Sequence, residues 1–116
     1  MQLRSFYASP GSLALAIEDT TRVAVGIVGF IVLPNSTGEI RRLYVTEASR
    51  GSGLGRRLVQ DLMARAEGLG LSRLVLNTLP TMTQAQALYK SLGFVACEPY
   101  IANPTDGVLF FERRLA

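Results

Sequence analysis

The sequence contains no histidine and no tryptophan, and Cys97 is its only cysteine. Without histidine, a zinc site or a histidine-based catalytic triad lacks its usual ligands and bases, so we expect no metal site. A single cysteine forms no intrachain disulfide, and no histidine is present to activate its thiol. We therefore expect Cys97 to pack as a small apolar residue.

Charged residues are also scarce, at 18% of the 116 residues, whereas apolar residues reach 48%. No apolar run approaches the roughly 18 residues that a membrane-spanning helix needs, and residues 1–10 hold no apolar signal segment. We predict one domain over residues 1–116, with an irregular segment at 1–11. We expect it to be cytoplasmic and not to bind membranes.

Arginine dominates the basic residues, since all but one of the 12 are arginines. A cluster of them lies between positions 41 and 57: Arg41, Arg42, Arg50, Arg56 and Arg57. Arginine favours forked contacts with phosphate or carboxylate, but charge alone favours the alternative of a solvated basic face. The chain has neither a basic recognition helix nor an aromatic stacking platform, so we expect no nucleic-acid partner.

The hydrophobic pattern predicts strands before and after each of two helices. The runs "SLALAIED" and "VAVGIVGFIVL", with "TTR" between them, predict a hairpin, and "EIRRLYV" a third antiparallel strand ending near Val45. Further along, "SRLVLNT" predicts a buried strand, and "FVACEPY" and "VLFFERRL" two more extended segments.

Two helices complete the pattern. Apolar residues at helical spacing predict the first over about 53–69, ended by Gly70: Leu54, Leu58, Leu62, Ala66 and Leu69. The second runs to about residue 92, and "TMTQ" has capping-box spacing, with Thr81 as N-cap and Gln84 reaching back. The order β-β-β-α-β-α-β-β predicts an α/β (α+β) chain with a mixed, mostly antiparallel sheet and two helices.

Three glycines, Gly51, Gly53 and Gly55, precede the first helix. The first turn of a helix exposes unpaired N–H groups and a partial positive charge, so a glycine loop there can hold a phosphate. The alternative is a glycine turn without a ligand. The dinucleotide fingerprint fails because Arg56 or Leu58 stands where it needs glycine, and the P-loop fails because arginines follow Gly55.

The stretch resembles the GNAT superfamily of acyl-CoA-dependent N-acyltransferases, whose pyrophosphate loop reads Q/R-x-x-G-x-G/A. Arg50, Gly53 and Gly55 match it. The runs "EIRRLYV" and "AQALYKSLGF" are also similar to segments of the family, and "NPTDGVLFFERRL" is similar to the C-terminal end of small bacterial members, so the resemblance covers about residues 12–115. It implies an acetyl-CoA-dependent N-acetyltransferase that acetylates an amine of a small molecule or protein. The alternative is an inactive CoA-binding module.

The resemblance also implies a set of binding and catalytic residues. The pyrophosphate would bind Arg50, Gly51, Ser52, Gly53, Leu54, Gly55 and Arg56. The pantetheine arm would lie between two splayed strand edges, formed by Leu43, Tyr44 and Val45 and by Leu76, Asn77 and Thr78. The Val45 amide would polarise the thioester carbonyl, and Tyr89 would protonate the leaving sulfur while contacting the cofactor. From its position we take Glu39 as the best candidate base, with Glu47 and Glu112 as weaker ones; an exposed strand-end role is the alternative for Glu39.

Two features depart from the family pattern. Met82 stands where many members have an asparagine that contacts pantetheine. The family also usually has N-terminal helices that cover one face of the sheet, and this sequence reaches its first hairpin almost at once. We therefore expect either a fragment or short form, or a homodimer in which a second copy covers that face.

Overall fold

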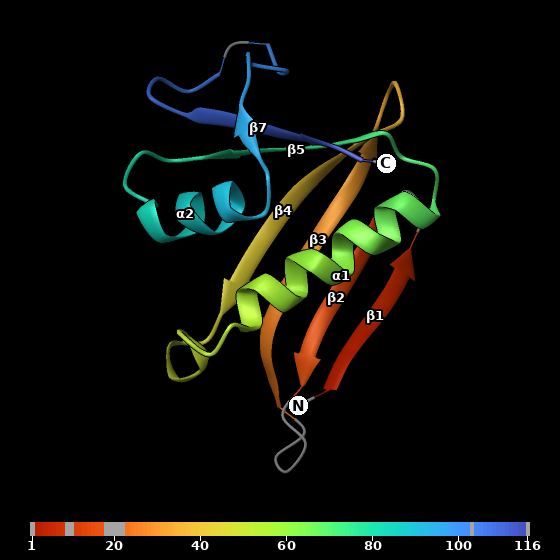
Figure 1. The fold of residues 1–116 in the computed structure, drawn as a ribbon, viewed down its shortest axis with the longest axis vertical. Coiled ribbons are helices and arrows are strands. Elements are labelled where there is room, and N and C mark those ends of the chain that lie inside the picture. The colour runs from red at the N-terminus through yellow and green to blue at the C-terminus, as the bar shows by residue number, and fades with distance from the viewer. Residues whose placement is uncertain (1, 9–10, 18–22, 103, 116) are drawn as a thin grey trace.

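A computed structural model describes residues 2–8, 11–17, 23–102 and 104–115 (Figure 1). Its strands are β1 (Gln2–Ala8), β2 (Gly11–Ile17), β3 (Ala24–Leu33), β4 (Thr37–Val45), β5 (Arg73–Thr78), β6 (Val95–Ala96) and β7 (Leu109–Arg114). Its helices are α1 (Leu54–Gly68), which follows the short 3-10 turn η1 (Glu47–Ser49), and α2 (Thr83–Ser91).

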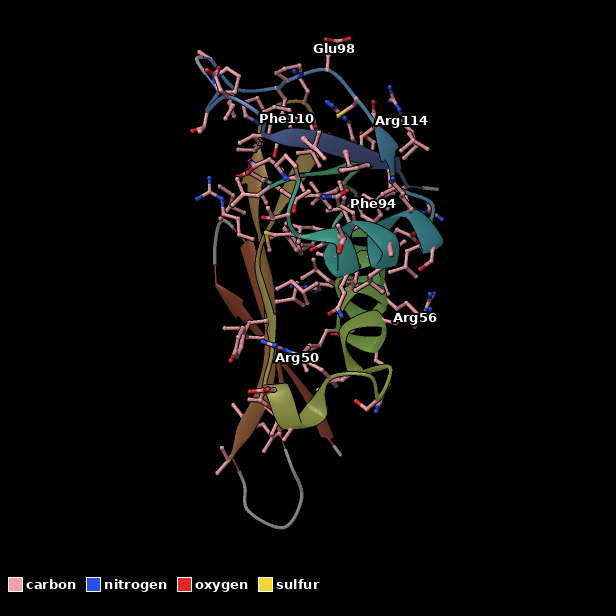
Figure 2. The ribbon with its side chains drawn as sticks, turned by 90° about the vertical axis from the view of Figure 1, so that its left-hand side faces the viewer. Arg50, Arg56, Phe94, Glu98, Phe110 and Arg114 are labelled. Carbon is pink, nitrogen blue, oxygen red and sulfur yellow. The ribbon has the colours of Figure 1, made fainter. Side chains whose placement is uncertain are left out.

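The strands form one sheet in the order β1-β2-β3-β4-β5-β7-β6. Neighbouring strands are antiparallel except β4 and β5, which run parallel. Helix α1 lies across β2, β3 and β4 (Figure 1), and α2 lies on the same side of the sheet (Figure 2). The predicted fold, a mixed and mostly antiparallel sheet with two helices, is therefore confirmed.

The N-terminal segment differs from our expectation of an irregular stretch over residues 1–11. Strand β1 pairs along its whole length with β2, from Gln2 opposite Ile17 to Ala8 opposite Gly11. Pairing with an existing strand stabilises an extended segment whose own sequence alternates weakly, which explains why the local pattern missed it. The predicted hairpin of β2 and β3 is present, and its "TTR" turn lies outside the described residues.

The predicted capping box at the start of α2 is wrong. Met82 is the N-cap, and no side chain among the described residues caps the helix. Instead, the Gln86 side chain donates from Nε2 to the carbonyl oxygens of Leu79 (2.9 Å) and Pro80 (3.2 Å). These bonds tie the loop to the second turn of α2, so a tertiary arrangement replaces the local one. The extended segment after α2 is also shorter than predicted, since β6 holds only Val95 and Ala96.

The main core lies between the helices and the sheet. Leu54, Leu58, Leu62 and Ala66 of α1 are buried, as the periodicity predicts, but Leu69 is 45% exposed because α1 has ended before it. Strand side chains alternate between faces, so Leu74, Leu76 and Phe111 join this core. Their neighbours Val75 and Phe110 are buried on the opposite face. We call these the helix face and the opposite face.

Strands β4 and β5 separate after a short contact. Their parallel ladder has three residue pairs, which join Thr37, Gly38 and Glu39 to Arg73, Leu74 and Val75. Beyond Glu39, β4 continues beside β3, whereas β5 continues beside β7. Figure 1 shows the two strands diverging, with α2 next to the opening. Two strand edges therefore face each other without pairing, at the place where the sequence predicts splayed edges.

Candidate active site

A cleft of about 500 Å³ opens where β4 and β5 diverge. It is lined by Glu39, Ile40, Arg41, Leu43, Leu76, Asn77, Thr78, Met82, Ala85 and Tyr89. Six of these, Glu39, Leu43, Leu76, Asn77, Thr78 and Tyr89, are residues that the sequence predicts for the site. Three elements contribute to the cleft, since β4 and β5 form its edges and α2 supplies Ala85 and Tyr89.

A second hollow, of about 410 Å³, continues the cleft toward the glycine loop. The two share Leu43, Met82 and Ala85, so they form one path along β4 and α2. The predicted residues that line the second hollow are Tyr44, Val45, Arg50, Gly51, Gly53, Leu54, Gly55 and Arg56, again with Leu43. Ser52 lines neither hollow, and its hydroxyl donates to the carbonyl oxygen of Ser49 (2.5 Å).

The three glycines serve two different purposes. Gly51 and Gly53 have φ of +81° and +82°, a left-handed conformation that side chains disfavour, and a Cβ on either would point into open space. A Cβ on Gly55 would lie 3.3 Å from Cδ2 of Leu88, so this glycine lets α1 approach α2 closely. Two glycines therefore shape the loop, and the third sets the spacing of the two helices.

The first turn of α1 presents free N–H groups and positive charge. Its first internal hydrogen bond joins the Arg57 N–H to the Gly53 carbonyl (3.1 Å), and no side chain of the described residues caps the turn. Arg56 and Arg57 lie in this turn, and it holds no acidic residue. Cations at a helix N-terminus oppose the helix dipole, so this arrangement favours binding of an anion.

The end of β4 presents the Val45 amide to the opening. The Thr46 N–H donates to the Val25 carbonyl of β3 (2.8 Å). Successive residues of a strand point their N–H groups to opposite edges, so the Val45 N–H faces away from β3. On that side Arg50 donates from Nε to the Val45 carbonyl (3.0 Å), and its guanidinium lies 5.7 Å from the centre of the Tyr44 ring. Figure 2 shows Arg50 against the sheet and Arg56 on the helix side.

Tyr89 lies on α2 with its ring in the core and also lines the cleft. The residue is 5% exposed, and its ring meets Phe94 edge-on at 5.4 Å between centroids. Burial raises the pKa of Tyr89 well above its usual value, because the charged phenolate is poorly solvated there. The hydroxyl therefore stays protonated across the neutral range, as a hydrogen-bond donor must.

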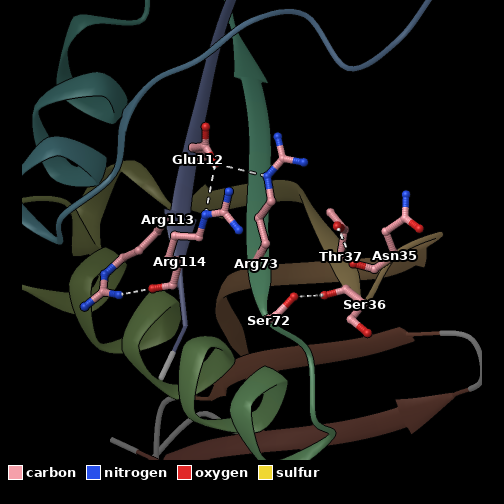
Figure 3. A network of polar contacts seen from close by, with 8 residues as sticks. All are labelled: Asn35, Ser36, Thr37, Ser72, Arg73, Glu112, Arg113 and Arg114. Atoms are coloured by element: carbon pink, nitrogen blue, oxygen red, sulfur yellow. Dashed lines mark hydrogen bonds and ion pairs between the residues drawn. The ribbon is translucent and has the colours of Figure 1, made fainter.

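Glu39 is the buried carboxylate of the cleft. It is 3% exposed and accepts a hydrogen bond from Arg41 Nε at Oε1 (2.5 Å), so it is not an exposed strand-end glutamate. The two weaker candidates lie elsewhere. Glu47 is exposed on η1, and Glu112 forms an ion pair with Arg73 (3.2 Å) on β5, outside the cleft (Figure 3). Of the carboxylates considered as a base, the cleft contains only Glu39.

Sequence reasoning missed the side-chain roles of three residues near Glu39. Arg41 pairs with it, Asn77 lines the cleft from β5, and Tyr100 bonds to Asn77 from the loop after β6. Thr78 has a further unexpected property, because its buried hydroxyl oxygen has no hydrogen-bond partner among the residues that the structure describes. The resemblance places Asn77 on the β5 edge without giving its side chain a role, and no sequence pattern indicates Tyr100.

Comparison with known proteins decides the family. Residues 2–94 match the model of the acetyltransferase (GNAT) family. The chain belongs to this family. It is 37% identical over 111 residues to an N-acetyltransferase of Schizosaccharomyces pombe, an alignment that covers 95% of this chain and 68% of the relative. This GNAT domain spans 68%, 36% and 52% of the lengths of three curated relatives that it matches.

Solved structures show the same fold. An acyl-CoA N-acyltransferase from Klebsiella pneumoniae superposes with a TM-score of 0.85 at 26% identity, covering 91% of this chain and 73% of the other. A GNAT acetyltransferase from Elizabethkingia anophelis, whose structure contains bound acetyl-CoA, superposes with a TM-score of 0.76 at 22% identity, covering 90% and 76%. Within the described part of this GNAT domain, neither helix is long and apolar enough to cross a membrane.

Proposed function

We propose that this GNAT domain transfers the acetyl group of acetyl-CoA to a primary amine, which attacks the thioester directly. The observation that carries the proposal is the continuous path from the glycine loop, through the gap between β4 and β5, to Glu39 and Tyr89. It joins an anion-binding turn to a buried carboxylate and a protonated phenol. A domain that only bound a nucleotide would not require the buried carboxylate or the protonated phenol.

The residues present fit acetyl-CoA, which supplies an activated acetyl group when bound. The N–H groups from Gly51 to Arg56 would hold the pyrophosphate at the start of α1. The unpaired edges of β4 and β5 would hold the pantetheine amides as an added strand does, and the unpartnered Thr78 hydroxyl offers a further hydrogen bond. Arg50 would keep the loop against β4 through the Val45 carbonyl.

Three groups of the chain would then act on the reaction. Glu39 takes a proton from the attacking amine, because a free alkylamine is largely protonated at neutral pH. The Val45 N–H stabilises the negative charge that develops on the thioester oxygen. Tyr89 donates a hydrogen bond to the leaving sulfur. Its raised pKa makes full proton transfer to a thiolate with a pKa of about 8.5 uphill, so hydrogen bonding is its main contribution.

Tyr89→Phe is expected to lower kcat by roughly tenfold to a hundredfold while the affinity for acetyl-CoA hardly changes. The lost hydrogen bond forms only as the C–S bond breaks, and the retained ring keeps its contact with Phe94. Single-turnover rates and a cofactor titration measure the two quantities. Equal rates for the two proteins would return Tyr89 to a purely structural role.

The alternative function is an inactive CoA-binding module, which shares the loop and differs in turnover. Thermal unfolding with and without acetyl-CoA tests the binding that both share, since a ligand at a hundred times its Kd stabilises a protein by about 2.7 kcal/mol. Thiol release from acetyl-CoA over a panel of primary amines then separates them. Stabilisation without thiol release from any amine would establish the module, and no stabilisation would reject both.

We also propose a homodimer, in which a second copy covers the opposite face of the sheet. Support comes from the 48% apolar composition and from Tyr44, a side chain that is 54% exposed and that alternates with the core-packed Leu43 and Val45. Sedimentation at micromolar concentration is expected to give the mass of a dimer. A monomer under those conditions would contradict the proposal.

A further inference from the structure

Tyr100 contacts a residue of the cleft although it does not line the cleft itself. Its hydroxyl oxygen accepts a hydrogen bond from Asn77 Nδ2 at 3.1 Å. Asn77 lines the cleft, but Tyr100 does not. The contact joins residues 23 positions apart in the sequence. Tyr100 can therefore influence a ligand in the cleft only through the side chains that it contacts, such as Asn77.

The Tyr100 ring is fixed in place. It meets the buried Phe110 ring edge-on, with 5.3 Å between centroids and an interplanar angle of 85°. Phe110 is the partner of Asn77 in the β5–β7 ladder, so one pair of facing residues holds both the ring and the amide. The hydroxyl position is thus set by the sheet rather than by the flexibility of the loop.

The Glu39 carboxylate, which lines the same cleft as Asn77, also acts on the Tyr100 hydroxyl. Burial raises the pKa of Tyr100 above its usual value, and the hydrogen bond and negative charge of Glu39 raise it further, while the bond from Asn77 lowers it. The hydroxyl accepts from Asn77, which leaves its own proton to be donated. Asn77, Tyr100 and Glu39 therefore form one polar cluster on the opposite face of the sheet.

We propose that Tyr100 is a positioning residue that orients Asn77 and Glu39 to hold the nitrogen of the acceptor amine. The proposal rests on the proposed function and adds the site of the second substrate. Because Nδ2 of Asn77 donates to Tyr100, its Oδ1 remains as an acceptor for a ligand in the cleft. Arg41 occupies Oε1 of Glu39, which leaves Oε2.

The chemistry of these two oxygens selects the kind of acceptor. Both only accept hydrogen bonds, and an alkylammonium group only donates, with three N–H bonds. An alcohol has a single O–H and leaves one of the two oxygens without a donor. The cluster therefore fits a primary amine and discriminates against a hydroxyl group at the same place.

The kinetic test compares Tyr100→Phe with the wild-type protein, using acetyl-CoA and ethylamine as probes. The variant keeps the ring contact with Phe110 and loses only the hydroxyl. We expect the KM for ethylamine to rise about tenfold, the typical effect of losing a buried hydrogen bond that orients a binding group, with the KM for acetyl-CoA unchanged. Asp106→Asn, an exposed change in the same loop, is the matched control and should alter neither. An unchanged KM for ethylamine in Tyr100→Phe would overturn the proposal.

A second readout needs no turnover. The chain has three asparagines, at positions 35, 77 and 103, so selective ¹⁵N labelling gives few side-chain amide signals. We expect ethylammonium chloride to shift the Asn77 amide signals in the wild-type protein. We expect Tyr100→Phe to move those signals in the absence of the amine and to weaken the affinity for ethylammonium, measured from the shifts, about tenfold. If no amine releases thiol from acetyl-CoA, the proposed function fails, and these spectra alone decide the positioning role. Asn77 signals that Tyr100→Phe leaves unchanged would reject that role.

Discussion

Gly53→Glu is expected to abolish detectable binding of acetyl-CoA by calorimetry. The glutamate side chain would enter the open space in front of the α1 N-terminus, because nothing lies within 4 Å of a Cβ at Gly53. There it would place a carboxylate against the free N–H groups and the two arginines that would otherwise bind the pyrophosphate. The added charge therefore both occupies the anion site and repels the ligand.

The same substitution also forces a side chain into a left-handed backbone, which costs about 1–2 kcal/mol of folding stability. Gly70→Glu is the matched control. Gly70 has φ of +80°, also has open space around its Cβ, and lies at the other end of α1. We expect both variants to lose similar stability and only Gly53→Glu to lose acetyl-CoA binding. Unchanged affinity in Gly53→Glu would mean that the loop does not bind the cofactor.

Glu39→Gln is expected to lower kcat/KM for the amine by a hundredfold or more at neutral pH. The amide keeps the size of the side chain but cannot take the proton of the attacking amine. The deficit should shrink as the pH rises toward 10, because the free amine is then increasingly neutral and needs no base. A pH–rate profile of the two proteins measures this recovery, and a group that only binds substrate would not produce it.

Glu112→Gln is the control for the loss of an ion-paired carboxylate. Glu112 pairs with Arg73, much as Glu39 pairs with Arg41, but it lies outside the cleft. Replacing Glu112 should leave the rate within a factor of two of the wild-type rate at every pH. If Glu39→Gln behaves like Glu112→Gln, the base must be another group or a chain of water molecules.

The sequence predicted those parts of the fold that depend on local spacing. The apolar repeat of α1 corresponds to a buried face, and Gly51 and Gly53 correspond to a positive φ. The divergence of β4 and β5 was expected only through the resemblance of the loop and of "AQALYKSLGF" to a known family. No periodicity in the strands themselves indicates that they stop pairing after Glu39.

What the sequence did not predict depends on contacts between distant segments. Tyr100 lies in a loop without periodicity, and its role follows from the register that places Asn77 opposite Phe110. The start of α2 depends on Gln86 holding two loop carbonyls, which outweighs the local capping signal. Strand β1 depends on β2 for its pairing. In each case the missing information was the identity of a spatial neighbour.

The short ladder between β4 and β5 has a consequence for cooperativity. It divides the sheet into an antiparallel sheet of β1 to β4 and a smaller unit of β5, β7 and β6, joined by three residue pairs and by the helix packing. A molecule that forms hydrogen bonds to both open edges would extend that ladder and link the two units. Backbone amides of β4 and β5 beyond Glu39 should then exchange with deuterium more slowly when acetyl-CoA is present. Bound acetyl-CoA would act as an added strand between the two units. A higher concentration of the co-substrate would therefore lengthen the lifetime of the folded chain.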